Sequence, residues 1–367
     1  MVDIVQYLKE VVERGGSDLH ISVGSPPMMR QHGELIKLEK QILTDEDTTM
    51  LLSDLITDDL MEELERYRSI DFAIEIPLAG LIQRYRCNIF FQKDGMDGVF
   101  RVIPREVPTL KELNLPKNVE ELAWYKDGLI MITGPTGSGK STTISAIVDM
   151  INSTQSRHVF IIEDPIEYVH SDKQAIIHQR QIGLHTLSFK RAIRAAMRED
   201  ADVIVVGEMR DLETIEHVLT AASVGHLVLA TMHTPSAPKS VERFIEFYPS
   251  SRQNTIRMML ADCLRAVVAQ QLIPRADGLG RIPAVEIMIN CLPIANLIRD
   301  FKTHQIPSVM QTSKKIGMVS MDDYLMKLYK EGKITAIEAF EHSIDKKKLE
   351  SVLKPSRPRR YENEVKS

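Results

Sequence analysis

The chain has 367 residues, of which 43% are hydrophobic and 26% are charged, the composition of an ordinary soluble protein of about two domains. Its formal net charge of −5, from 46 basic and 51 acidic residues, gives no general attraction to nucleic acid or to an anionic membrane. No apolar run reaches the ~18 residues that span a bilayer, and the N-terminus has no secretory h-region, so we expect a cytoplasmic protein without direct membrane insertion. Cys87, Cys263 and Cys291 are scattered singly and form no disulfide framework, as suits the reducing cytosol.

Residues 1–105 are predicted to form a small α+β domain. A short amphipathic helix is expected at 3–14, where Gly15-Gly16 ends it, and the apolar–polar alternation of 18–23 predicts a strand. The acidic stretch 44–67 predicts one or two helices. The stretch 70–103 is strand-like throughout.

The second part of the chain has the pattern of an α/β domain. Prolines punctuate residues 106–122, which we interpret as a linker, and residues 123–353 form the second domain. The expected strands are 128–133, 158–163, 202–206 and 226–231, and the expected helices are 140–152, 188–199 and 212–223. Such alternation predicts a parallel sheet with crossover helices. Beyond residue 240 the pattern turns mainly helical, with 251–271 as the longest stretch, and residues 354–367 are expected to be disordered.

A phosphate-binding loop is the most specific motif of the sequence. Residues 134–141 match G-x-x-x-x-G-K-[ST] in full, between an apolar strand and a helix. The backbone N–H groups of such a loop cradle phosphates, Lys140 reaches the β- and γ-phosphates and Ser141 holds Mg²⁺. The residues expected to bind the nucleotide are Gly134, Pro135, Thr136, Gly137, Ser138, Gly139, Lys140, Ser141 and Thr142. ATP and Mg²⁺ are therefore the predicted ligands.

Two carboxylates and a histidine follow other predicted strands. Glu163 and Glu208 come at the carboxyl ends of their strands, where an open parallel sheet binds its ligands. One carboxylate can polarise the attacking water and the other can order Mg²⁺ through water. His233 ends the strand that begins after His226, and it can contact the γ-phosphate. The alternatives are solvated loop carboxylates and a structural histidine.

Two groups of basic residues have more than one interpretation. Arg84, Arg86 and Arg101 lie on neighbouring predicted strands, where they either neutralise a transferred phosphoryl group or form an ordinary charged sheet face. The helix at 188–199 carries Lys190, Arg191, Arg194 and Arg198 without interleaved aromatics. This pattern favours a solvated face or a subunit contact over a nucleic-acid strip.

These motifs, in this order, resemble the secretion-ATPase superfamily and specifically the type IV pilus retraction ATPases, the PilT/PilU twitching-motility proteins. The resembling segments are 16–20 near the N-terminus, the arginine-bearing strands 84–88 and 100–104, the "Asp box" 162–168, the Walker B segment 206–214, the "His box" 225–234 and the C-terminal segment 303–311. The chain lacks the four-cysteine zinc insertion and the long N-terminal extension that pilus assembly ATPases usually carry, which favours retraction over assembly.

The resemblance implies a hexameric cytosolic ring, at the inner membrane only through the pilus machine. Each subunit would have a PAS-like N-terminal domain and a RecA-like P-loop domain with a helical C-terminal part, and ATP would lie between them. Hydrolysis would act on an inner-membrane platform protein, PilC-like, to withdraw pilin. By analogy Glu163 is the catalytic base, Glu208 the Walker B glutamate that holds Mg²⁺ through water, and Arg84, Arg86 and Arg101 are candidate arginine fingers.

Some positions depart from the usual family pattern. Gln181 stands where a glutamate is usual, and His178 and His185 replace more usual Asn and Asp. The segment Pro293–Asp300 and the residue Pro235 also differ. The hydrolytic residues are complete, so the sequence predicts ATPase activity. The sequence leaves three roles open. The protein could be a principal retraction motor, an accessory paralogue that partners another ATPase, or an assembly or secretion ATPase.

Overall fold

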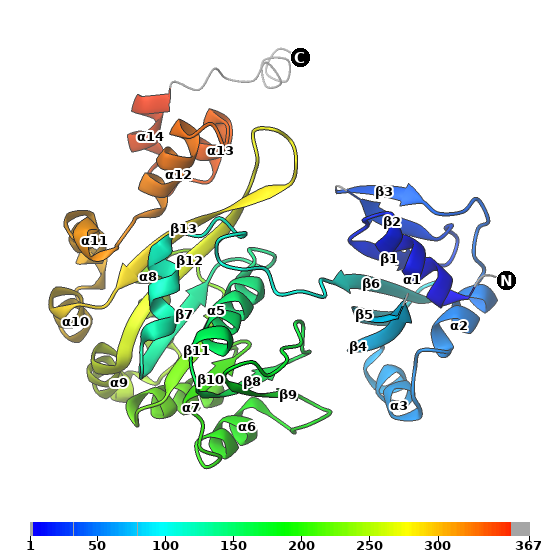
Figure 1. Cartoon of the computed structure of the whole chain (residues 1–367), viewed down its shortest axis with the longest axis horizontal. Helices are drawn as coiled ribbons and strands as arrows, with labels where there is room; N and C mark the ends of the chain where they lie inside the picture. The colour runs from blue at the N-terminus through cyan, green and yellow to red at the C-terminus, as the bar shows by residue number, and fades with distance from the viewer. Residues whose placement is uncertain (1–2, 32, 79, 354–367) are drawn as a thin grey trace. The chain divides into compact units, whose positions relative to one another are not determined.

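The computed structural model describes residues 3–31, 33–78 and 80–353 (Figure 1). The chain divides into two compact units. The N-terminal unit comprises Met1–Val107 together with Glu163–His170, and the second unit comprises Pro108–Ile162 and Ser171–Ser367. We call the second unit the ATPase unit, because it contains the loop that the sequence predicts to bind ATP. The second unit is therefore interrupted by a short segment that belongs to the first.

The N-terminal unit is an antiparallel sheet packed with three helices. The strand order is β3-β2-β1-β6-β5-β4. The elements are α1 (Ile4–Glu13), β1 (Asp18–Ile21), β2 (Met28–Gln31), β3 (Glu34–Lys37), α2 (Asp45–Ser53), α3 (Asp58–Tyr67), β4 (Ser69–Leu78), β5 (Leu81–Gln92) and β6 (Gly95–Ile103). Thr44 and Asp47 form a reciprocal capping box that starts α2. In the sheet, α1 contacts β1, α2 contacts β6 and α3 contacts β4.

Strand β5 shows how the sequence sets the two faces of this sheet. Tyr85, Cys87 and Ile89 point into the core and are fully buried, whereas Arg84 and Arg86 occupy the alternate positions. The Tyr85 hydroxyl donates to the backbone oxygen of Leu8 in α1 at 3.0 Å, which satisfies its only polar group inside the core. The two predicted arginines of β5 therefore lie on the face opposite the core.

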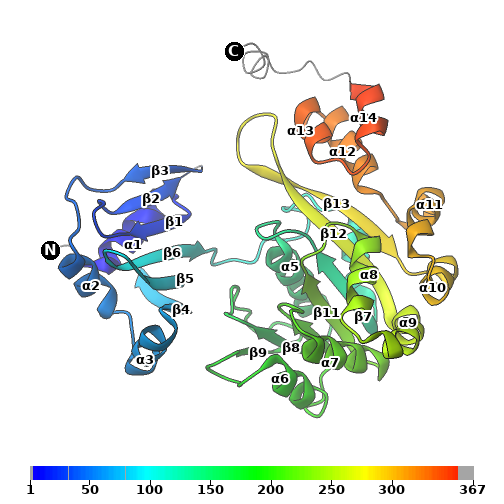
Figure 2. The same cartoon turned by 180° about the vertical axis from the view of Figure 1, so that it is seen from behind.

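The ATPase unit is built around a seven-stranded sheet with the order β13-β12-β7-β11-β10-β8-β9 (Figure 2). Its strands are β7 (Gly128–Thr133), β8 (His158–Glu163), β9 (Ile176–Gln181), β10 (Val203–Val206), β11 (Leu227–Met232), β12 (Leu264–Pro274) and β13 (Arg281–Ile289). The pairs β12–β7, β7–β11, β11–β10 and β10–β8 are parallel. The central strands are buried on both faces, which explains why their sequences are continuously apolar.

Helices cover both faces of this sheet. The elements are α4 (Lys117–Glu120), η1 (Glu121–Trp124), α5 (Lys140–Thr154), α6 (Phe189–Ala196), α7 (Leu212–Ser223), α8 (Ala237–Glu246), α9 (Ser250–Cys263), α10 (Leu292–Arg299), η2 (Thr303–Gln305), α11 (Ile306–Thr312), η3 (Lys314–Ile316), α12 (Met321–Lys330), α13 (Ala336–Glu341) and α14 (Lys346–Leu353). One core cluster joins the sheet to α6 through α11, and the other joins it to α4, η1, α5 and α12 through α14. The unit is thus a three-layer α/β structure.

Two predictions about this unit are wrong. The sheet is mixed rather than parallel, because β12 and β13 form an antiparallel hairpin. The longest helix expected at 251–271 ends at Cys263, and Leu264 begins a strand that pairs with β7. The segment contains no glycine or proline between 250 and 273, so the change from helix to strand is set by pairing with β7 rather than by a local stop signal.

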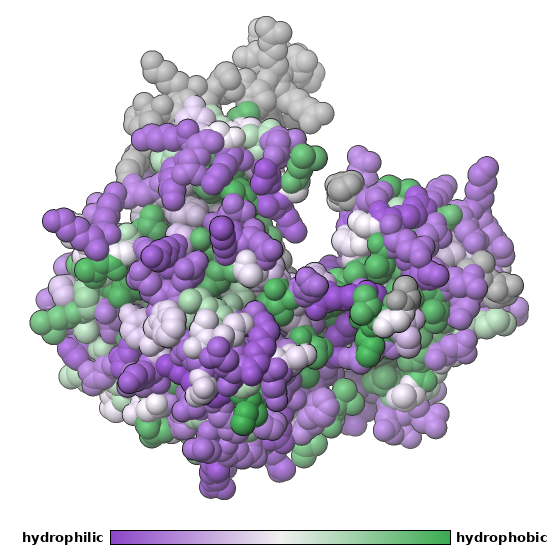
Figure 3. Space-filling model, in the orientation of Figure 1, coloured by the Kyte–Doolittle hydropathy of each residue, from purple (hydrophilic) through white to green (hydrophobic). Residues whose placement is uncertain are grey.

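The remaining features concern the surface and the termini. No helix within the described ranges combines the length and the apolar character needed to cross a bilayer. On the face viewed in Figure 3, hydrophilic residues predominate and hydrophobic ones are scattered between them. The tail predicted to be disordered, residues 354–367, lies outside the described residues. Cys87 and Cys263 are buried, Cys291 is partly exposed, and all three are free.

Candidate nucleotide site

The loop between β7 and α5 has the backbone conformation that a phosphate cradle needs. Gly134, Gly137 and Gly139 all adopt positive φ angles, of 145°, 76° and 85°. A β-carbon at Gly134 would lie 2.2 Å from the backbone oxygen of Gln270, so only glycine fits there. Gly139 caps α5, whose 15 residues direct their first free N–H groups and the positive end of the helix dipole at the loop. The loop therefore fits an anionic phosphate group.

Gln270 of β12 holds this loop from the neighbouring strand. Its side-chain amide donates to the backbone oxygen of Ser138 at 2.7 Å, and its side-chain oxygen accepts from the Thr143 hydroxyl at 2.8 Å. Gln270 is 3% exposed, so both bonds lie away from water. Sequence reasoning missed this residue, although the polar pair Gln270-Gln271 inside an apolar run was a usable signal.

Lys140, His233 and Glu208 form a connected polar row beside the loop. The ammonium of Lys140 donates to the backbone oxygens of Gly134 and Pro135, both at 3.0 Å, and lies 3.4 Å from Nδ1 of His233. Nε2 of His233 lies 2.9 Å from the Glu208 carboxylate. Because an ammonium can only donate, Nδ1 accepts from Lys140 and the ring proton sits on Nε2, facing Glu208. Three of the predicted site residues are thus brought together.

The environment of Glu208 favours its charged form. Burial opposes ionisation, but Arg210 at 2.7 Å, His233 and Lys140 outweigh it, so the pKa of Glu208 is lowered. An ionised carboxylate beside the loop has the chemistry of a Mg²⁺ partner. Ser141, the other residue predicted to hold Mg²⁺, is the second residue of α5. Within the described residues, no cluster of three or more His, Cys, Asp or Glu side chains could hold a metal by itself.

The two histidines that flank β11 lie at opposite ends of the strand. His233 directly follows the strand at its carboxyl end, as predicted, whereas His226 precedes it at the opposite end of the sheet. The Nδ1 atom of His226 lies 2.7 Å from the backbone oxygen of Ala201. This contact joins the loop before β11 to the loop before β10, at the amino ends of both strands. The position of His226 therefore fits a structural role.

Hydroxyl groups reinforce the carboxyl end of β7. The Ser240 hydroxyl of α8 lies 3.2 Å from the Thr133 hydroxyl and 2.6 Å from that of Thr234, and all three residues are buried. The buried carboxylate of Glu286 accepts from the backbone N–H of Ala237 at 2.7 Å, which fixes the start of α8. These residues were not predicted from the sequence, because their partners lie far away along the chain.

Glu163 ends β8, whose Ile162 pairs with Val206 of β10, and it is the first residue of the segment assigned to the N-terminal unit. The residue keeps partial exposure, but protein atoms crowd its carboxyl group. Burial raises the pKa of Glu163 to about 8, the Glu167 carboxylate adds to the rise, and Arg84 opposes it. A carboxylate with a pKa near neutrality is suited to accept a proton from water.

The three predicted arginines belong to the N-terminal unit and are all paired. Arg86 forms two hydrogen bonds to Asp71, at 2.7 and 3.1 Å, and one to Glu167 at 3.2 Å. Arg84 binds Glu75 at 2.6 Å and the backbone oxygen of Ile166 at 3.1 Å. Both arginines of β5 are therefore tied to the segment that begins with Glu163.

Arg101 of β6 lies directly opposite Arg86 in the sheet. It binds the buried Asp18 at 2.8 Å, while its own side chain stays 69% exposed. It is the most accessible of the three predicted arginines, since the side chains of Arg84 and Arg86 are 17% and 33% exposed. The prediction that the arginines lie on neighbouring strands is confirmed by this register.

Three residues that depart from the usual family pattern, Gln181, His178 and His185, lie in β9 or in the turn after it. Gln181 is buried at the end of β9, and its backbone N–H donates to Nδ1 of His185 at 3.0 Å. Nδ1 of His178 lies 2.8 Å from Nε2 of His158 and its ring stacks on Phe160, with centroids 5.1 Å apart. The substituted residues thus stabilise β9 and the turn after it.

Comparison with known proteins gives a consistent picture. A family model described as "Type II/IV secretion system protein" matches residues 2–296. The chain is 41% identical over 340 residues to the type IV pilus retractation ATPase PilT of Pseudomonas aeruginosa, covering 93% of this chain and 98% of that protein. It is 37% identical to the type IV pilus ATPase PilU of the same organism, covering 96% and 92%. The crystal structure of the pilus retraction motor PilT with bound ADP matches with a TM-score of 0.86 and 43% identity, over 96% of this chain and all of that one.

The mixed α/β fold and the loop with its polar row define a P-loop ATPase. The chain belongs to the type II/IV secretion system protein family. Within that family it is an ATPase of the pilus retraction type, as its end-to-end similarity to PilT shows.

Proposed function

We propose that this chain is a subunit of a hexameric, ATP-hydrolysing motor that powers type IV pilus retraction. The motor withdraws pilin by acting on an inner-membrane platform protein of the PilC kind, and it works in the cytoplasm at the periphery of that membrane. The observation that carries this proposal is the similarity to a retraction ATPase over 98% of the relative's length, together with an intact phosphate loop. In this proposal the N-terminal unit is PAS-like and the ATPase unit is RecA-like.

The residues of the ATPase unit have defined roles in this proposal. The loop from Gly134 to Thr142 holds the phosphates of ATP, and Lys140 exchanges its two loop carbonyls for phosphate oxygens. Mg²⁺, when bound, neutralises phosphate charge, and Ser141 and, through water, Glu208 would hold it. His233 keeps the Lys140 ammonium and the Glu208 carboxylate apart and reports on the γ-phosphate.

The N-terminal unit supplies the remaining groups. Glu163 accepts the proton of the attacking water, which its raised pKa favours near neutral pH. One of Arg84, Arg86 and Arg101 stabilises the charge on the transferred phosphoryl group, in its own subunit or a neighbouring one. Because Arg84 and Arg86 bind the segment that follows Glu163, their release on nucleotide binding is a means of coupling hydrolysis to movement.

An accessory role beside a second, paralogous ATPase is the alternative that specific observations favour. The identity to PilU is close to that to PilT, and Gln181, His178 and His185 depart from the usual pattern. An assembly ATPase is disfavoured, because the identity to the pilus assembly ATPase PilB of Myxococcus xanthus is 27% over 49% of that protein.

Deletion of the gene separates these functions. If the chain is the principal retraction motor, cells that lack it should carry many surface pili that do not retract. If it is an accessory motor, their pili should retract with reduced force. Loss of surface pili would instead support an assembly role. ATP turnover by the purified chain, measured alone and with its paralogue, completes the distinction.

A further inference from the structure

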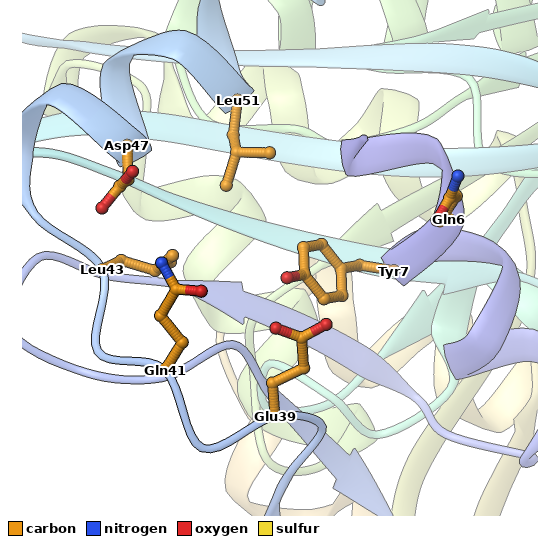
Figure 4. A pocket seen from close by; sticks show the side chains of 7 residues that line it. All are labelled: Gln6, Tyr7, Glu39, Gln41, Leu43, Asp47 and Leu51. Carbon is orange, nitrogen blue, oxygen red and sulfur yellow. The ribbon is translucent and has the colours of Figure 1, made fainter. Parts of the chain in front are cut away.

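Carboxylates stand at the N-termini of several helices of this chain, in different surroundings. Asp47, which is partly exposed, completes the capping box of α2 and lines a hollow of about 460 Å³ in the N-terminal unit (Figure 4). Glu286 of β13, in contrast, is only 5% exposed. Burying a carboxylate is costly unless hydrogen bonds compensate for the lost water, so the partners of Glu286 indicate its role.

Glu286 joins the starts of two helices of the ATPase unit. One of its carboxylate oxygens accepts from the backbone N–H of Ala237, the first residue of α8, at 2.7 Å. The other accepts from the backbone N–H of Met321, the first residue of α12, at 3.4 Å. Burial raises the pKa of Glu286, and these two N–H groups oppose the rise. A single side chain thus satisfies a free N–H group at each helix start.

A second buried carboxylate extends this connection. Asp322, the residue after Met321 in α12, is 8% exposed. Its two oxygens accept from the backbone N–H of Ile344 at 2.7 Å and from that of Asp345 at 3.0 Å. These two residues directly precede α14. The starts of α8, α12 and α14 are therefore linked through two side chains that are shielded from water.

The other end of this connection lies beside the phosphate loop. Three residues separate His233 from the start of α8. The hydroxyl of Thr234, in this short loop, lies 2.6 Å from that of Ser240 in α8, and both residues are buried. His233 itself contacts Lys140 and Glu208. The place of α8 therefore limits where the His233 ring can lie.

We propose that Glu286 is a positioning residue, which holds α8 and thereby His233, and which couples both to the C-terminal helices α12 and α14. The proposal rests on the proposed function, in which His233 reports on the γ-phosphate. Because α8 and α12 share one carboxylate, a shift of α8 on phosphate binding alters the group that also holds α12. The stability of α12 and α14 then differs between the ATP and the ADP state.

Glu286→Gln tests the positioning role with little change of shape. An amide has one accepting oxygen and an NH₂ group that only donates, so one of the two backbone N–H groups loses its acceptor. We expect kcat to fall about tenfold, because His233 is held less well, and Kd for ADP to change by less than about twofold, because the phosphate loop is untouched. Glu246→Gln, at the exposed other end of α8, is the matched control and should keep both values.

A double-mutant cycle with His233→Ala separates positioning from a general loss of stability. If Glu286 acts through His233, the double variant should have the kcat of His233→Ala alone, within about twofold. Independent effects would multiply instead, with a further loss of about tenfold. A mere loss of folded protein would lower turnover by the same factor with and without His233, and thermal melting of each variant measures that loss.

Hydrogen exchange tests the coupling to the C-terminal helices. In the unchanged chain, the amides of α12 and α14 should exchange at different rates with ADP and with a non-hydrolysable ATP analogue. This difference should disappear in Glu286→Gln and persist in Glu246→Gln. The comparison in the unchanged chain does not depend on whether any variant folds.

Several results would overturn the inference. An additive loss of kcat in the cycle, or an affinity for ADP that falls together with kcat, excludes the positioning role. Equal exchange of α12 with both nucleotides, or a nucleotide-dependent difference that survives in Glu286→Gln, excludes the coupling. In each of these cases the unchanged chain still hydrolyses ATP. An unchanged chain that neither binds nor hydrolyses ATP contradicts the proposed function and this inference together.

Discussion

At the scale of single residues, the two carboxylates of the site differ in their environments. Burial and Glu167 raise the pKa of Glu163 to about 8, whereas Arg210, His233 and Lys140 lower that of Glu208 against the opposing effect of burial. Two acidic groups whose pKa values are driven apart are suited to different tasks. Glu163 fits a base that takes up a proton, and Glu208, whose pKa is lowered, fits an ionised partner of a cation.

The lysine of the phosphate loop gives the simplest prediction. Lys140→Ala removes the charge that moves from the loop carbonyls to the phosphates, so kcat should fall by about two to three orders of magnitude. Phosphate release assays measure this directly. Lys126→Ala, which alters an exposed lysine, is the control and should keep full turnover.

The pH dependence of turnover tests the role of Glu163. A base with a pKa of about 8 must lose its proton to act, so kcat/KM should fall as the pH drops below that value. Glu167→Gln removes the neighbouring negative charge, lowers the pKa of Glu163, and should move the acidic limb of the profile to lower pH. An unmoved limb would show that Glu167 does not influence the titrating group.

Stability should respond to the same group in a predictable direction. The pKa of Glu163 is higher in the folded than in the unfolded chain, so folding gains from its protonated form and loses stability as the pH rises from about 4.5 to about 8. Glu163→Gln should therefore raise the melting temperature at pH 8 by a few degrees and leave it nearly unchanged at pH 4.5. Thermal unfolding at both pH values measures the difference.

At the scale of elements, β12 links the hairpin to the phosphate loop. Gln270→Leu would remove the bonds to Ser138 and Thr143 and leave their polar groups buried without partners. We expect KM for ATP to rise about tenfold, since a cost of about 1.4 kcal/mol in loop order corresponds to that factor. Gln271→Leu changes the next residue, whose side chain faces His342 instead, and should alter KM much less.

The elements also show what the sequence predicts well. Strand β7 was predicted at its observed bounds, because a strand buried on both faces is a short, continuous apolar run bounded by glycines. The hairpin of β12 and β13 was missed, because alanine, leucine and glutamine suit a helix as well as a strand and no local signal ends α9. Gln270 lies more than a hundred residues from the loop it holds, so only tertiary structure reveals its contact.

At the scale of the candidate site, motif spacing located the phosphate loop, Glu208 and His233 but not their connections. The row from Lys140 through His233 to Glu208 joins the ends of three strands that are separated by long stretches of chain. The three predicted arginines were placed on the correct strands, but their pairing with Asp71, Glu75 and Asp18 depends on cross-strand register. Register is set by pairing in three dimensions and is not encoded by any single motif.

At the scale of the whole molecule, the two units share one stretch of chain around Glu163. Glu163 belongs by sequence to a strand of the ATPase sheet and by packing to the N-terminal unit, so the chain passes between the units at its expected catalytic base.

The central claim is that ATP hydrolysis by this chain withdraws pili. The most direct measurement is the retraction of fluorescently labelled pili in cells that lack the chain and are complemented with the unchanged protein or with Glu163→Gln. We predict that the unchanged protein restores retraction, while the variant leaves abundant pili that extend but do not retract. Pili that retract at normal speed with the variant, or without the chain altogether, would contradict the account.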